Sequence, residues 1–122
     1  MFATRPLHGE LEKKIKAAKT ALMTRPGVYA NVNKVVGELY ELDIVSPGQV
    51  WKLILELLDE IRPENYAGGR PPQRSYEKTI EDRELFAFCW DSLKLGKKMY
   101  MKFALKEGRY YYVSLHESRN QL

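Results

Sequence analysis

The sequence predicts an α+β protein in which N-terminal helices pack on one face of a roughly four-stranded antiparallel sheet. Apolar residues recur at three- and four-residue steps in the first half of the chain and alternate in the second half, and a loop rich in proline and glycine separates the two. The 122 residues suit a single domain, with a helical part (1–62), a loop (63–74) and a sheet (75–117).

The helical part contains three predicted helices. The first runs from about Pro6 to Met23, and a short extended piece at Val28-Tyr29 follows it. The second runs from about Asn31 to Glu41. The third begins at Ser46-Pro47, where an N-cap hydroxyl precedes a proline at the first helical position, and it ends before Pro63.

The second half begins with an irregular segment, Arg62 to Arg74, which contains three arginines. It is either a solvated connector or a basic flap that meets a polyanion. Two strands are predicted next, at Ser75–Ile80 and at Leu85–Asp91. A β-hairpin, 97–105 and 109–116, completes the predicted sheet.

The closing hairpin alternates between an apolar and a polar face. The apolar face is expected to be core and comprises Met99, Met101, Phe103, Leu105, Tyr111, Val113 and Leu115. The other face comprises Tyr100, Lys102, Tyr110, Tyr112, Ser114 and His116.

The register of the hairpin depends on the length of its loop. A three-residue loop (107–109) needs no bulge and places Tyr100 opposite His116, so we favour it, although its glycine is not at the usual last position. A two-residue loop would set Phe103 opposite Tyr112, which belong to different faces, and would require a bulge. A five-residue loop would slide Tyr100 off His116.

The composition argues against disulfides, metal sites and membrane spans, and it permits a polyanion partner. The single Cys89 rules out an internal disulfide and a cysteine-based zinc site, and the histidines and acidic residues show no metal-ligand spacing, so no cofactor is expected. No stretch approaches the ~20 apolar residues of a membrane span, and we expect a cytoplasmic protein. The net charge of +4 permits a polyanion partner without requiring one.

The polar face of the hairpin has a composition that suits RNA cleavage by transesterification. That reaction needs a base for the 2′-hydroxyl proton, cations for the charged phosphorane and an acid for the leaving oxygen. His116 is the natural acid or base because imidazole titrates near neutrality, and Lys102 and Lys78 would provide charge. An exposed sheet face also carries such residues without any substrate, so a purely structural interpretation competes.

The segments Met99-Tyr100-Met101-Lys102-Phe103 and Val113-Ser114-Leu115-His116-Glu117 resemble the V-Y-x-K-(hydrophobic) and V-S-F-K-E segments of the MqsR toxins. Ser75-Tyr76-Glu77-Lys78-Thr79-Ile80 is similar to that family's F-Y-K-S-M strand. The MqsR toxins are mRNA-cleaving members of the RelE-like fold from bacterial toxin–antitoxin systems. The resemblance spans about residues 30–117 and implies a RelE-like endoribonuclease with mRNA as substrate and a cognate antitoxin protein as partner.

The resemblance also implies catalytic roles for Tyr100, His116 and Lys78. Tyr100 matches the family's catalytic tyrosine, His116 occupies the position of a catalytic lysine, and Lys78 lies one residue from the family's first-strand lysine. The chain departs from the family at Ala87, where a glutamine is expected, and at His116, where a titratable group replaces a permanent cation. The residues expected to contact RNA are Lys102, Arg74, Arg83, Tyr112, Ser114 and Arg119.

Two other functions remain open at this point. The same basic, aromatic sheet face would suit a non-catalytic module that binds single-stranded nucleic acid. Alternatively, an exposed edge strand would suit a protein-interaction domain, such as an inhibitor, that pairs with a target protein.

Overall fold

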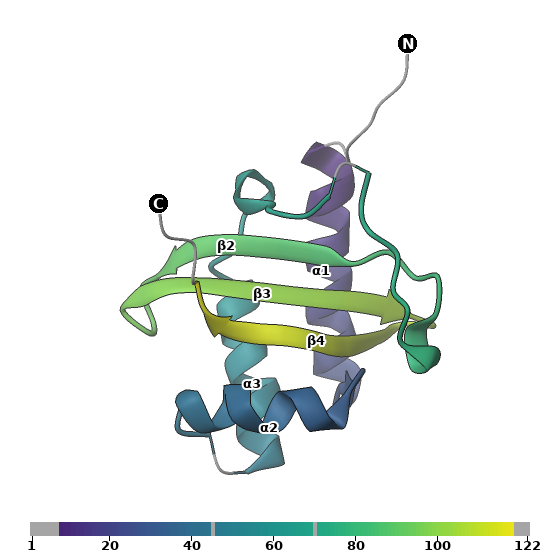
Figure 1. Ribbon diagram of the computed structural model, residues 1–122. Coiled ribbons are helices and arrows are strands. Elements are labelled where there is room, and N and C mark those ends of the chain that lie inside the picture. The colour runs from purple at the N-terminus through teal and green to yellow at the C-terminus, as the bar shows by residue number, and fades with distance from the viewer. Residues whose placement is uncertain (1–7, 45, 70, 119–122) are drawn as a thin grey trace.

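The computed structural model describes residues 8–44, 46–69 and 71–118 (Figure 1). Its elements in order are α1 (His8–Thr24), β1 (Val28–Tyr29), α2 (Val32–Glu41), α3 (Pro47–Leu58), the 3₁₀ turns η1 (Pro63–Asn65) and η2 (Lys78–Ile80), β2 (Phe86–Ser92), β3 (Lys97–Lys106) and β4 (Arg109–Glu117). The strands form one sheet in the order β1-β4-β3-β2. In Figure 1, α1 and α3 lie behind this sheet and α2 lies along its β4 side. The predicted α+β class is confirmed.

Side chains close to the first residues of α2 and α3 form hydrogen bonds that stabilise the start of each helix. Asn31 is the N-cap of α2, and its side-chain oxygen accepts a hydrogen bond from the Asn33 N–H at 3.1 Å. Ser46 is the N-cap of α3, and its N–H donates to Gln49 Oε1 at 3.2 Å. The predicted start of the first helix at Pro6 lies outside the described residues. No helix in the described part of the chain is long and apolar enough to cross a bilayer.

The sheet is mixed, which corrects the prediction of an antiparallel one. β2, β3 and β4 are antiparallel neighbours, but β1 pairs with β4 in parallel. The predicted strand at Ser75–Ile80 is wrong, because this segment closes on itself. Ser75 Oγ accepts from the Glu77 N–H at 3.0 Å, and the Ile80 N–H donates to the Glu77 carbonyl at 3.0 Å. Local bonds of this kind compete with strand pairing.

The closing hairpin turns through two residues, so the predicted three-residue loop is wrong. Glu107 and Gly108 have φ values of 53° and 73°, as a two-residue turn with both residues in the left-handed region requires. The register then shifts between Lys102 and Phe103, which leaves Val113 without a partner on β3 as a bulge. Beyond the bulge the predicted alignment returns. The expected pair Tyr100–His116 is therefore confirmed, and Lys102 pairs with Ser114.

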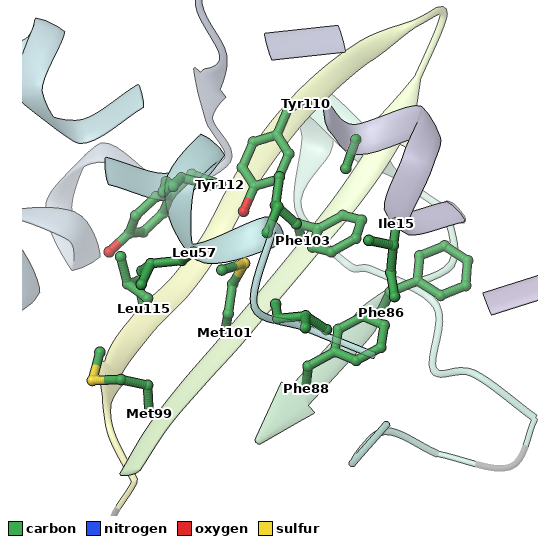
Figure 2. Close-up of a cluster of buried hydrophobic side chains, with 14 of the residues drawn as sticks. Ile15, Leu57, Phe86, Phe88, Met99, Met101, Phe103, Tyr110, Tyr112 and Leu115 are labelled. Carbon is green, nitrogen blue, oxygen red and sulfur yellow. The ribbon is translucent and has the colours of Figure 1, made fainter. Parts of the chain in front are cut away.

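The bulge exchanges the faces of β4. Tyr110 and Tyr112 were expected on the exposed face, but each is only 1% exposed and belongs to the core cluster. Figure 2 shows both rings among Phe103, Met101 and Leu115. Because the bulge inserts one extra residue, even-numbered residues face the core before it and odd-numbered residues face the core after it.

Glu38 of α2 is bound to β4 on both sides of the bulge. Glu38 Oε1 accepts a hydrogen bond from the Tyr112 hydroxyl at 2.7 Å and another from the Leu115 N–H at 3.0 Å. Burial raises the pKa of the Tyr112 phenol, and its hydrogen bond to Glu38 raises it further. The Tyr110 hydroxyl is buried too, but it has no hydrogen-bond partner among the described residues.

A second carboxylate, Glu60, holds the turn between β2 and β3. Glu60 Oε1 accepts from Trp90 Nε1 at 2.9 Å and from Ser92 Oγ at 2.8 Å, and Oε2 accepts from the Lys94 N–H at 2.8 Å. Burial alone raises the pKa of Glu60, but these hydrogen bonds outweigh it and lower the pKa below its usual value. The ionised form is therefore the one that stabilises this turn.

The two buried tyrosines provide a matched test of the Glu38 contact. Tyr112→Phe removes a hydrogen bond to a carboxylate, and we expect it to lower the free energy of unfolding by about 1–3 kcal/mol. Tyr110→Phe removes only an unpartnered hydroxyl, and we expect it to be neutral or stabilising. Urea unfolding of both variants measures the difference, and equal destabilisation would contradict the assignment.

Glu60 predicts how stability depends on pH. A carboxyl whose folded-state pKa is lowered stabilises the fold above its unfolded pKa, near 4.5, and this contribution is lost as the pH falls through the folded pKa. We expect Glu60→Gln to be less stable than the wild type at about pH 6 and the gap to narrow towards about pH 3. Urea unfolding across this range tests it, and a pH-independent gap would exclude the ionised Glu60 as the cause.

Candidate active site

The sheet face opposite α1 and α3, called the outer face here, carries two rows of aligned side chains. Met99 and Met101 of β3 are fully buried in the core, so the alternating residues of that strand point to the outer face. One row consists of Cys89, Tyr100 and His116, and the next consists of Ala87, Lys102 and Ser114. The structure thus brings together Tyr100, His116, Lys102 and Ser114, four of the residues predicted for the site.

Tyr100 and His116 form a stacked pair. Their ring centroids are 5.1 Å apart with an interplanar angle of 24°. His116 Nδ1 lies 2.8 Å from the carbonyl oxygen of Glu117. A carbonyl only accepts, so Nδ1 carries the proton and the lone pair of the neutral ring is on Nε2. Nε2 is therefore the atom of this imidazole that can take up a proton.

The phenol of Tyr100 is kept in its protonated form. Burial raises the pKa of Tyr100, and the neighbouring Cys89 and Tyr66 raise it further. Tyr100 is therefore a proton donor at neutral pH and does not act as a phenolate base. An acid and a base thus lie side by side on neighbouring strands.

Lys102 places a positive charge beside this pair. Its Nζ lies over the Tyr100 ring, 5.9 Å from the centroid. Burial lowers the pKa of the Lys102 ammonium, and the cation of Lys34 on α2 lowers it further. Among the described residues neither lysine forms an ion pair with a carboxylate. Two cations therefore lie close together at the site, and neither is in an ion pair among the described residues.

Lys78 is not close to the stacked pair. It belongs to η2, which lies at the hairpin end of β3, where Lys106 Nζ donates to the Thr79 carbonyl at 2.9 Å. Lys106 is six residues along β3 from Tyr100, so their Cα atoms are about 20 Å apart. Among the described residues no contact joins Lys78 to Tyr100 or His116.

Arg74 and Arg83 line a separate groove with Lys14, Phe86 and Leu105. Arg74 Nη1 donates to the Asp82 carbonyl at 2.8 Å, and the groove also contains acidic side chains that balance its charge. These arginines lie away from the stacked pair.

The remaining residues predicted to contact RNA lie in different places. Tyr112 is in the core, where it cannot reach RNA, and Ser114 lies on the outer face but is only 4% exposed. Arg119 lies outside the described residues. Ala87, where the resemblance would place a glutamine, lies directly beside Lys102 in the second row.

Sequence reasoning missed Lys34. It lies on a helix far from the hairpin in sequence, and only the packing of α2 against β4 brings it near Lys102. No local pattern distinguishes it from the other exposed lysines. Groups of three or more metal-ligating side chains are not found in the part of the chain that the structure describes.

The hydrogen bond of His116 predicts its tautomer. At about pH 9, where an ordinary imidazole is neutral, we expect the His116 proton on Nδ1. Long-range ¹H–¹⁵N correlation spectra distinguish the two nitrogens. A His116 ring protonated on Nε2 would contradict the proposed proton-accepting atom.

No protein-family model, curated protein or solved structure matches this chain.

Proposed function

We propose that this protein is a metal-independent endoribonuclease that cleaves mRNA by 2′-hydroxyl transesterification, with the RelE-like fold and toxin role of the MqsR family. The observation that carries the proposal is the Tyr100–His116 stack with Lys102 beside it. It combines a proton acceptor, a proton donor and a cation on one face of the sheet.

The two rings divide the proton transfers. His116 Nε2 takes the proton of the 2′-hydroxyl as the 2′-oxygen attacks phosphorus. Tyr100, which its raised pKa keeps protonated, gives its proton to the 5′-oxygen as the P–O5′ bond breaks. The products are a 2′,3′-cyclic phosphate and a 5′-hydroxyl. Exchange with solvent returns both rings to their starting states.

Lys102 stabilises the charge that develops on the phosphorane. It lies diagonally across the β3–β4 pair from His116, and such neighbours have Cα atoms about 7–8 Å apart. A phosphate that contacts the Lys102 ammonium is thus within reach of the imidazole. Charge stabilisation of this kind is often the largest single contribution to catalysis.

The outer face would also be the surface that a partner controls. In a toxin of this class, a cognate antitoxin protein covering this face would block access of mRNA, and both molecules would meet in the cytoplasm. The arrangement of helices on one face and a functional opposite face is compatible with a RelE-like organisation.

RNA cleavage in EDTA tests the proposed function. The wild type is expected to cleave a single-stranded RNA and to leave the 2′-deoxy analogue intact, because the nucleophile is then missing. His116→Ala should reduce the rate by at least about 100-fold, and His8→Ala, which changes the other histidine, should not.

Two outcomes would contradict the proposal. Unchanged cleavage by His116→Ala would exclude the site, and salt-sensitive RNA binding by the wild type without cleavage would favour a non-catalytic binding module. Expression in bacteria gives a second measure: the wild type should arrest growth, and His116→Ala should relieve the arrest.

A further inference from the structure

We propose that Lys34 of α2 and Lys102 of β3 together bind one backbone phosphate of single-stranded RNA beside the Tyr100–His116 pair. The inference rests on the proposed function, since it names the part of the substrate that this site holds. It assigns a substrate-binding role to a helix outside the sheet.

The position of Lys34 follows from its neighbours on α2. Asn31 Nδ2 donates to Glu77 Oε2 at 3.4 Å, and Glu38 Oε1 accepts from the Leu115 N–H at 3.0 Å. Lys34 is three residues after Asn31 and four before Glu38, so all three lie on the same side of the helix. The backbone that carries Lys34 is therefore held in place on both sides by contacts with the rest of the fold.

The lateral neighbours of Lys102 are small, and its side chain is partly exposed. On β2 it is paired with Ala87 and on β4 with Ser114, whereas in the next row Tyr100 has an imidazole beside it. The Lys102 side chain is half-buried and lies over the Tyr100 ring. The part of Lys102 that stays exposed is the part an anion would contact.

Two ammonium groups lie close together at this place, and the nearest acidic groups on that side of α2 are engaged elsewhere: Glu38 accepts from Tyr112 and Leu115, and Glu77 from Asn31. Lys34 and Lys102 repel each other, and no described carboxylate forms an ion pair with either. A phosphodiester has one negative charge and two free oxygens, so each ammonium can bind one oxygen. Binding would remove the repulsion that the free protein contains.

The neighbouring rings favour a polynucleotide over an isolated anion. Tyr100 and His116 are partly exposed aromatic side chains, and unpaired bases commonly stack on such groups. A phosphate held by the two lysines would place the adjoining nucleotide over these rings. The site therefore combines the two contacts that proteins use for single-stranded RNA.

The test measures binding of a 2′-O-methyl oligonucleotide, which cannot be cleaved, by fluorescence anisotropy at several salt concentrations. We expect Lys34→Ala to weaken binding by about tenfold and to reduce the slope of log K against log salt by about 0.7, which corresponds to one lost phosphate contact. Lys34→Arg should retain binding. Lys52→Ala, which removes an exposed helical lysine of α3, should leave both quantities unchanged.

A second readout follows Lys102 directly by NMR of its side-chain Cε. Because Lys34 lowers the pKa of Lys102, Lys34→Ala should raise that pKa in the free protein. Addition of the oligonucleotide should raise it in the wild type and have a smaller effect in the variant. Alanine favours helix, so circular dichroism should show that α2 is kept.

The outcomes separate this inference from the proposed function. If Lys34→Ala binds the oligonucleotide as tightly as the wild type and the wild type cleaves RNA, the inference is wrong and the proposed nuclease function stands. Lys34-dependent binding by a protein that does not cleave would support the inference and overturn the nuclease. If inorganic phosphate displaces the oligonucleotide at an equal concentration of phosphate groups, the site is one for free phosphate and the proposal of RNA binding is wrong.

Discussion

The hydrogen bonds of Glu38 to β4 are the interaction on which the arrangement of this protein depends. The bulge at Val113 places Tyr112 in the core, and a single oxygen, Glu38 Oε1, accepts hydrogen bonds from the Tyr112 hydroxyl and from the Leu115 N–H. An unpartnered N–H at this position would cost about 1–3 kcal/mol. The same contact fixes α2 against the sheet, so one glutamate joins the core, the strand and the helix that carries Lys34.

The bulge also divides the hairpin into a part that contributes aromatic residues to the core and a part that carries the candidate site. On its hairpin side, β4 contributes Tyr110 and Tyr112 to the core, and η2 lies at the end of the sheet through the contact between Lys106 and Thr79. Beyond it, the outer face presents the stacked rings of Tyr100 and His116. A bulge that restores register after a tight turn therefore decides which aromatic residues stabilise the fold and which are available to a substrate.

The Tyr100–His116 pair is predictable from the sequence even though the predicted hairpin loop is wrong. The alternation of β3 and the pairing of the strand ends were predicted, but the two-residue turn with a bulge was the alternative not chosen. Both solutions align Tyr100 with His116, which is why the pair was predicted although the turn was not. The resemblance to the MqsR toxins and the positive charge of Lys78 place it with the pair, and Arg74 and Arg83 join it as cations, but the expected strand at 75–80 does not form.

The sequence by itself determined the elements whose cause is local: the three helices, the strands with alternating residues, and the presence of phenol, imidazole and ammonium groups on one hairpin. The tertiary structure alone decided the addition of β1 in parallel, the burial of Tyr112 and the approach of Lys34 to Lys102. Each depends on contacts between segments far apart in the chain, such as those of Val28 with Tyr111 and of Glu38 with Tyr112. Periodicity and capping act over one or two turns of chain, so they do not specify contacts at that range.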